Sequence, residues 1–124
     1  MQKDLKSSET VGFLKSFGYA FSGIFYMLRT QRSARVHLFL TFVALILGGI
    51  LHISSGEWTV IILAIGLVFS MELVNTSVEY LTDLLSPDIH PKAGLAKDIA
   101  AGAVLFSAMA AAIIGLIVFL PKLF

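Results

Sequence analysis

The sequence contains no cysteine, which excludes disulfides, thiolate catalysis and cysteine-ligated zinc. Charged residues are also scarce: they make up only 14% of the 124 residues, and the formal net charge of +1 carries no message about partners by itself. No nucleic-acid partner is expected. The first 30 residues have no compact apolar core followed by a small-residue cleavage site, so a cleaved signal peptide is not expected either.

Hydrophobic residues, in contrast, make up 57% of the chain, and they form apolar runs that a soluble domain of this length could not bury. We therefore predict one all-α integral membrane domain over residues 1–124, with three spans at 36–53, 59–84 and 99–120. The second span is longer than a bilayer requires, so its polar end should protrude into water. Small residues in the third span predict close packing against another helix.

Residues 9–32 have helical apolar spacing and many phenylalanines, which predicts an amphipathic helix lying in the membrane interface. A packed soluble helix is the alternative. Residues 52–58 should form a short turn with Trp58 as an interfacial anchor, and residues 86–94 a loop. Pro121 should stop the third span, and Asp98 is placed to cap its start.

Basic residues predict the orientation. They precede the first span and recur between the second and third, whereas the first turn has none; the residues concerned are Lys3, Lys6, Lys15, Arg29, Arg32, Arg35, Lys92 and Lys97. Because short cytoplasmic loops carry an excess of Lys and Arg, the N-terminus and the second loop should face the cytoplasm. The polar end of the second span should then lie at the cytoplasmic surface of a cell membrane.

A polar stripe lies on the second span. At roughly 100° per residue, its four members share one helix face about 80° wide: Glu72, Asn75, Glu79 and Asp83. Carboxylates at membrane depth cost several kcal/mol, and like charges one turn apart repel, which favours a binding site. Interhelical hydrogen bonding within a bundle is the alternative for Glu72 and Asn75.

The chemistry of this stripe suits a hard cation such as Mg²⁺ and the phosphates that it carries. Glu72 lies about 10 Å deeper along the helix than Glu79, so a deep base and a shallower metal ligand could bring a lipid hydroxyl to a water-borne nucleotide. The sequence has no Walker motif and no kinase glycine-rich loop, so any nucleotide site must be of another design.

The segment MELVNTSVEYLTDLLSPDIHPKAGLAKDIAAGAVL resembles the E-x-x-N-[ST]-x-[IV]-E-x-x-x-D pattern of the small prokaryotic diacylglycerol kinase and undecaprenol kinase family. The likeness extends to FGYAFSGI, to RTQRSARVH and to the ending GLIVFLPK. The ISSGEW, HP, AKDIAAGAVL and FLPK segments are more similar to the Gram-positive undecaprenol kinases. The resemblance implies an ATP-dependent, Mg²⁺-dependent lipid kinase in the bacterial cell membrane. It also implies a homotrimer whose sites are shared between protomers.

The resemblance also implies residue roles. Glu72 matches the catalytic base, Asn75 a support for Glu72 or for the phosphates, and Glu79 a magnesium ligand. Nucleotide-side positions are matched by Tyr19, Asp83, Asp88, His90, Lys97 and Asp98. Gln31 stands where family members usually carry a second metal-binding Glu, which suggests weaker metal binding or a rearranged ligand set.

Some positions differ from the family pattern, and two histidines are expected to have no role in the site. Gly12 replaces an Arg of the enteric relatives, and Lys15 or Arg35 could substitute for it in part. His37 and His52 are expected to be interfacial polar residues rather than ligands.

The alternative functions are a kinase acting chiefly on diacylglycerol and, from another class, a small oligomeric ion or proton transporter. A transporter would need a continuous polar path, but the outer halves of the first and third spans have no polar row that matches the stripe of the second span.

Overall fold

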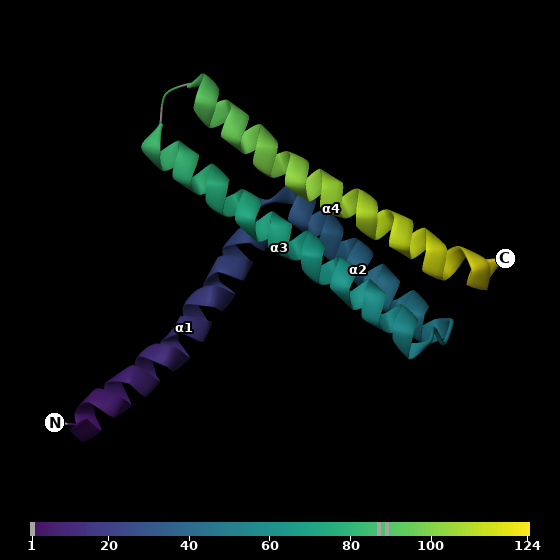
Figure 1. Ribbon diagram of the computed structural model, residues 1–124, viewed down its shortest axis with the longest axis horizontal. Coiled ribbons are helices and arrows are strands. Elements are labelled where there is room, and N and C mark those ends of the chain that lie inside the picture. The colour runs from purple at the N-terminus through teal and green to yellow at the C-terminus, as the bar shows by residue number, and fades with distance from the viewer. Residues whose placement is uncertain (1, 87, 89) are drawn as a thin grey trace.

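The computed structural model describes residues 2–86, 88 and 90–124, with side chains from Ser8 onward. The side chains of Lys3 and Lys6, used above for the orientation, therefore lie outside the described part. The described chain folds into α1 (Gln2–Thr30), α2 (Arg32–Ile50), α3 (Ser55–Leu85) and α4 (Pro91–Leu123). Helices α2, α3 and α4 run side by side, whereas α1 leaves their bundle at an angle (Figure 1). The prediction of an all-α protein is confirmed.

The helices have the length and composition of membrane spans. All four are long and apolar enough to cross a bilayer, including the Ser8–Thr30 part of α1. Large apolar side chains such as Phe39, Phe106 and Ile117 are exposed on their outer surfaces. Apolar surface of this extent is stable only against lipid or another protein surface. The structure is thus that of a multi-pass membrane protein, and the interfacial position of α1 stays a prediction.

Helices α1 and α2 meet at Gln31, whose backbone is extended (φ −104°, ψ 114°). The Arg35 guanidinium Nη1 donates hydrogen bonds to the carbonyls of Leu28 at 3.0 Å and Arg29 at 2.9 Å. These carbonyls lie at the end of α1, where no further helical N–H can reach them. Arg35 therefore closes α1 and fixes the corner, so we no longer expect it to replace the Arg missing at Gly12.

Helix α3 begins at Ser55, earlier than the predicted span start of 59, because Ser54 and Glu57 form a reciprocal cap. The Glu57 N–H donates to Ser54 Oγ at 3.1 Å, and the Ser54 N–H donates to Glu57 Oε1 at 2.9 Å. The predicted turn over residues 52–58 is thus too long, and Trp58 lies in the first turn of α3. Helix α2 ends at Ile50, so the last residues of the predicted 36–53 span lie in the turn.

Helix α4 begins at Pro91, and the predicted loop to residue 94 is wrong. His90 caps it, since its Nδ1 accepts a hydrogen bond from the Lys92 N–H at 3.1 Å, and proline is well tolerated at the first helical position. The predicted cap Asp98 lies inside the helix, so that prediction is also wrong. Pro121 does not stop the helix either: it lies in the last turn, and α4 continues to Leu123.

Helix α3 packs mainly against α4, which confirms the predicted packing role of the small-residue helix. Ala100, Val104 and Ser107 are the buried residues of α4 on the half nearer its start. Short side chains let the two helix backbones approach closely. Near the other end, Ile53, Ile61 and Val118 form the buried apolar cluster, and a Lys122–Glu57 ion pair of 3.2 Å links the two helices.

Candidate active site

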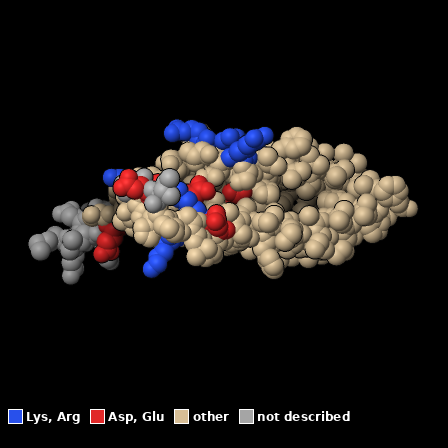
Figure 2. All heavy atoms as spheres, turned by 90° about the horizontal axis from the view of Figure 1, so that it is seen from above, with Lys and Arg blue, Asp and Glu red and all other residues tan. Residues whose placement is uncertain are grey.

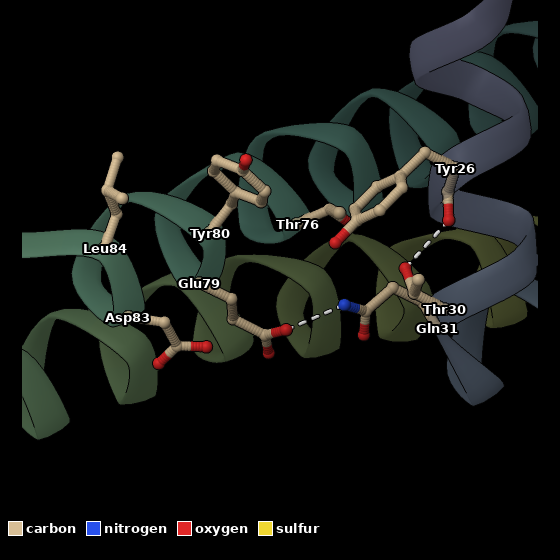
Figure 3. Close-up of a pocket in the computed structure, with 8 residues that line it drawn as sticks. All are labelled: Tyr26, Thr30, Gln31, Thr76, Glu79, Tyr80, Asp83 and Leu84. Carbon is tan, nitrogen blue, oxygen red and sulfur yellow. Dashed lines mark hydrogen bonds between the residues drawn. The ribbon is translucent and has the colours of Figure 1, made fainter. Parts of the chain in front are cut away.

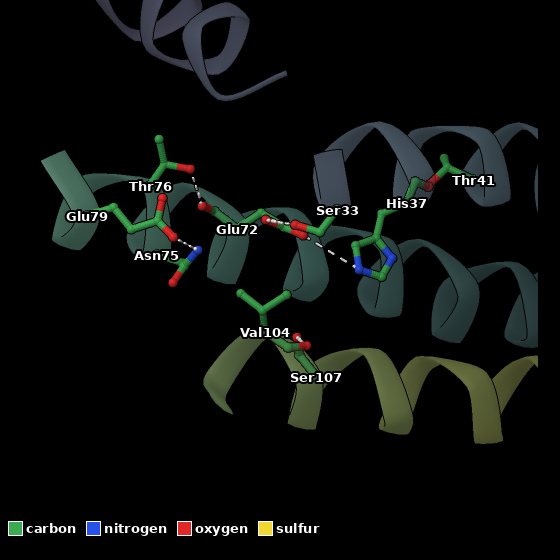
Figure 4. Close-up of polar contacts among 9 residues, drawn as sticks. All are labelled: Ser33, His37, Thr41, Glu72, Asn75, Thr76, Glu79, Val104 and Ser107. Carbon is green, nitrogen blue, oxygen red and sulfur yellow. Dashed lines mark hydrogen bonds and ion pairs between the residues drawn. The ribbon is translucent and has the colours of Figure 1, made fainter. Parts of the chain in front are cut away.

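Glu72 lies on α3 and is completely buried, with 0% of its surface exposed. The Ser33 hydroxyl of α2 donates a hydrogen bond to Glu72 Oε2 at 3.1 Å (Figure 4). Its other oxygen, Oε1, has no hydrogen-bond partner among the described residues, although His37 Nε2 lies 3.6 Å away. A buried carboxylate with one unpaired oxygen is costly unless a ligand or a charge compensates it. This position is the strongest candidate for chemistry in the described chain.

Glu79 lies two turns further along α3 and links two amide side chains. Gln31 Nε2 donates a hydrogen bond to Glu79 Oε2 at 2.7 Å, and Asn75 Nδ2 donates to Glu79 Oε1 at 3.4 Å. Asn75 is 5% exposed, and its Oδ1 has no partner within the described part of the chain. The α1–α2 corner and α3 thereby place two amides and a carboxylate together.

A polar pocket of about 510 Å³ opens beside Glu79, where the end of α1 faces α3 (Figure 3). Its lining consists of Tyr26, Thr30, Gln31, Thr76, Glu79, Tyr80, Asp83 and Leu84. The rings of Tyr26 and Tyr80 meet edge to face, with centroids 6.1 Å apart, and form one wall. The volume lies within the range of pockets that hold small ligands.

Charged side chains gather around this end of α3. Lys97 of α4 forms an ion pair with Asp83 of α3, which brings a positive charge to a residue of the polar pocket. Figure 2 shows acidic and basic side chains together over one half of the visible face, whereas the other half of that face carries none. The sequence predicted this clustering of the polar end of the second span with basic residues.

The remaining predicted site residues are not brought to the pocket. Tyr19 is 74% exposed on α1, and Tyr26, two turns later, lines the pocket instead. His90 caps α4, and Asp88 and Asp98 are exposed. Among the contacts of the described residues, none joins these four side chains to Glu72 or Glu79 in a single chain.

Two residues of α2, Ser33 and His37, were missed as site residues. His37 was expected to be an interfacial polar residue, yet it lies beside Glu72. The available signal was their spacing of four at the start of the mostly apolar helix, which places both side chains on one face. Which helix this face meets could not be read from the sequence.

An apolar groove of about 400 Å³ runs from His37 between α2, α3 and α4. Its lining is almost entirely aliphatic, with Leu40, Val43 and Leu47 from α2 facing Ile61 and Ala64 from α3 and the small residues of α4. Glu72 contacts His37 at this groove, while Glu79, on the same helix, lines the polar pocket. The buried carboxylate thus lies between an apolar and a polar compartment.

The donor set fits a magnesium ion. In the described residues, no group of three or more His, Cys, Asp and Glu side chains could hold a metal. Mg²⁺ in phosphoryl-transfer sites, however, needs only one or two carboxylates and takes its other ligands from phosphates and water. Glu79 provides the carboxylate, and the amide oxygen of Gln31 can turn toward the same place because the amide can flip.

Comparison with known proteins identifies relatives among the lipid kinases. The family described as prokaryotic diacylglycerol kinase matches residues 18–119. The chain is 46% identical over 111 residues to the undecaprenol kinase of Bacillus subtilis (strain 168), covering 90% of each chain. It is 40% identical over 111 residues to a diacylglycerol kinase of Synechocystis, covering 89% of this chain and 63% of that one. These matches, which span most of the sequence including both α2 and the acidic stripe of α3, establish that the chain belongs to the prokaryotic diacylglycerol kinase family of lipid kinases.

Proposed function

We propose that this protein is an ATP-dependent membrane kinase that transfers the γ-phosphate of ATP to the hydroxyl of undecaprenol. The observation that carries the proposal is the position of Glu72, buried with an unpaired oxygen between an apolar groove and a polar pocket. A lipid alcohol and a nucleotide must meet at such a boundary. The likeness to the Bacillus subtilis undecaprenol kinase supports this choice of lipid.

Glu72 acts as the general base in this proposal. Its free Oε1 accepts the proton of the lipid hydroxyl, and the hydroxyl oxygen attacks the γ-phosphorus. The new bond is the phosphate ester, the bond from the γ-phosphorus to the β,γ-bridging oxygen breaks, and ADP leaves with that oxygen. Ser33 holds Oε2 meanwhile, and Asn75, one turn from Glu72, offers a buried amide oxygen on the nucleotide side.

Glu79 and Gln31 would hold magnesium beside the polar pocket, where the ion neutralises phosphate charge and orients the γ-phosphoryl group. Asp83 and Lys97 lie at the same end, and Lys97 can turn from Asp83 to a phosphate oxygen. We assign Tyr19, Asp88, His90 and Asp98 to the nucleoside and phosphate side on the family resemblance. Because one chain does not bring them to the pocket, this assignment requires a neighbouring protomer.

We further propose a homotrimer in the cell membrane with its active sites at the cytoplasmic surface. The exposed apolar side chains of α2 and α4 leave ample surface for contacts between protomers. Light scattering in detergent should give a protein mass of about three times the chain mass of 13.4 kDa. A fully active species with the mass of a single chain would contradict a trimeric site.

The experiment that tests the function measures transfer from γ-labelled ATP with Mg²⁺ to undecaprenol and to diacylglycerol, offered separately in the same mixed micelles. Label mainly in undecaprenyl phosphate is expected. Label mainly in phosphatidic acid would keep the kinase and change its substrate to that named for the Synechocystis relative. No label in either lipid would overturn the kinase and favour an ion-conducting role for the acidic stripe.

A further inference from the structure

Two side chains of α2 face the two oxygens of Glu72, one each. Ser33 Oγ donates a hydrogen bond to Oε2 at 3.1 Å, and His37 Nε2 lies 3.6 Å from Oε1 (Figure 4). Ser33 and His37 are four residues apart, so they project from the same face of α2 on consecutive turns. Side chains of α2 therefore lie next to both carboxylate oxygens of Glu72 on α3.

The charge of Glu72 needs a partner beyond Ser33. An ionised carboxylate that is fully buried is destabilising by several kcal/mol unless a cation and hydrogen bonds compensate it. Among the ion-pair contacts of the described residues, the His37 imidazole is the only basic group within 4 Å of Glu72, with its Nε2 3.6 Å from Oε1. Among the described residues that line the groove with His37, none is acidic or basic; its neighbours there include Thr41 on its own helix and Ala108 and Ala111 of α4.

We propose that His37 is the positioning residue of the catalytic base. It donates the Nε2 hydrogen to one lone pair of Glu72 Oε1 and fixes the direction of the carboxylate, while the other lone pair of Oε1 stays available to accept the lipid proton. The proposal rests on the proposed function, since it gives Glu72 the role of base. His37 itself does not touch the reacting atoms.

The observed distance is compatible with this role. A separation of 3.6 Å is longer than an N–H···O hydrogen bond, and closing it requires a movement of about 0.6 Å. Catalytic hydrogen bonds are often long without substrate and shorten when the complex forms. His37 is 19% exposed in its side chain and lies at the end of an open groove, so it has room to move.

The groove provides the competing explanation, which is that His37 is only part of the wall that contacts the lipid chain. The two roles differ in what they change. A wall residue affects the KM for the lipid, whereas a positioning residue affects kcat and leaves both KM values in place.

The test compares His37→Phe, His37→Gln and Thr41→Val with the wild-type protein in mixed micelles, using the lipid that the wild type phosphorylates. Phe retains the ring shape without a donor, whereas the Gln side-chain NH₂ reaches close to the position of Nε2. Thr41 lines the same groove one turn further on and does not contact Glu72, so it is the matched control. Each variant is measured for kcat, for the KM of ATP and of lipid, and for thermal stability.

The expected result is a loss of kcat of about 10- to 100-fold in His37→Phe, the size of a lost hydrogen bond to a charged group, with both KM values within about twofold of wild type. His37→Gln should recover most of the activity, and Thr41→Val should keep the wild-type kcat, with any change confined to the KM of the lipid. Three results would overturn the inference: wild-type kcat in His37→Phe, a change confined to the KM of the lipid, or equal losses of kcat and stability in the Phe and Gln variants. If the wild type itself is inactive, the proposed kinase function is wrong as well. A failure of the proposed function can thus be distinguished from a failure of the role proposed for His37.

Discussion

At the scale of single residues, the contact between Gln31 and Glu79 bears on how the proposed magnesium site would hold its ion. The amide donates to the carboxylate at 2.7 Å, so the site is satisfied without a metal. Two carboxylates at this distance would repel each other unless a cation lay between them. We therefore expect an amide at position 31 to stabilise the metal-free site and to give the proposed site a lower affinity for magnesium than a carboxylate would.

Replacing Gln31 by Glu should raise the affinity of the proposed site for magnesium and destabilise the metal-free site. We expect Gln31→Glu to reach half-maximal activity at a Mg²⁺ concentration about tenfold lower than the wild type, because a second charged oxygen ligand is added. Without magnesium, the same variant should melt at a lower temperature because of the repulsion from Glu79. A magnesium titration of the initial rate and melting curves with and without EDTA measure the two effects.

Gln31→Met is the matched control for this pair. It removes the hydrogen bond to Glu79 without adding charge, so it should lower stability slightly and should not lower the magnesium requirement. If the magnesium dependence of Gln31→Glu equals that of the wild type, position 31 is not a ligand and the rearranged ligand set is wrong.

The sequence predicts the acidic stripe well at this scale. Because helical periodicity sets which side chains share a face, Glu72, Asn75 and Glu79 could be grouped without a structure, and all three point toward the α1–α2 side of α3. The partner helix could not be found in this way. Ser33 and His37 reach Glu72 because α2 packs against α3, and this tertiary contact cannot be derived from helical periodicity.

At the scale of elements, the turn between α2 and α3 depends on a close approach at Gly48. A Cβ at this position would lie 2.6 Å from Trp58 Cη2 and 3.1 Å from Ile53 Cδ1. Trp58 thus packs on the backbone of α2, in addition to any role as an interfacial anchor. This contact belongs to the apolar cluster at the end of the bundle far from Glu72.

Gly48→Ala should therefore destabilise the protein by about 1 to 3 kcal/mol, the usual cost of overpacking a filled site. Gly49→Ala is the matched control, since a Cβ there would meet nothing within 4 Å and alanine favours the helix. Loss of helical circular dichroism on titration with SDS compares the two variants. Equal midpoints for Gly48→Ala and Gly49→Ala would show that the close contact does not matter.

The helix boundaries show where sequence reasoning on elements falls short. Hydropathy finds the apolar middle of each helix, but α3 and α4 begin before their apolar parts do. Their starts are set by local hydrogen bonds, from the Ser54–Glu57 cap and from His90 ahead of Pro91. The Ser-x-x-Glu and His-Pro signals were present in the sequence and could have corrected both starts.

At the scale of the whole molecule, charge is distributed unevenly along the bundle. The polar pocket and Lys97 lie toward the end where α3 meets α4, whereas the turn between α2 and α3 has no Lys or Arg. Because basic segments remain in the cytoplasm, the pocket end should face the cytoplasm, where ATP is available.

The absence of cysteine allows a direct test of this orientation. Lys92 and Ser55 are both exposed and lie at the start of α4 and of α3, on opposite sides of the predicted membrane. In intact cells an impermeant maleimide should label Ser55→Cys and leave Lys92→Cys unmodified, and inverted vesicles should give the reverse. Labelling of Lys92→Cys in intact cells would place the site on the wrong side of the membrane for ATP.

The account as a whole depends on Glu72 as the base of a lipid kinase, and the most direct test is the rate of γ-phosphate transfer to undecaprenol by Glu72→Gln compared with the wild type. Gln has nearly the same shape and can still accept the hydrogen bond of Ser33, so the fold should be retained. We predict a rate at least about 100-fold lower, the contribution of a general base, with unchanged helicity and oligomer mass. A transfer rate near that of the wild type in a correctly folded Glu72→Gln protein would contradict the central claim.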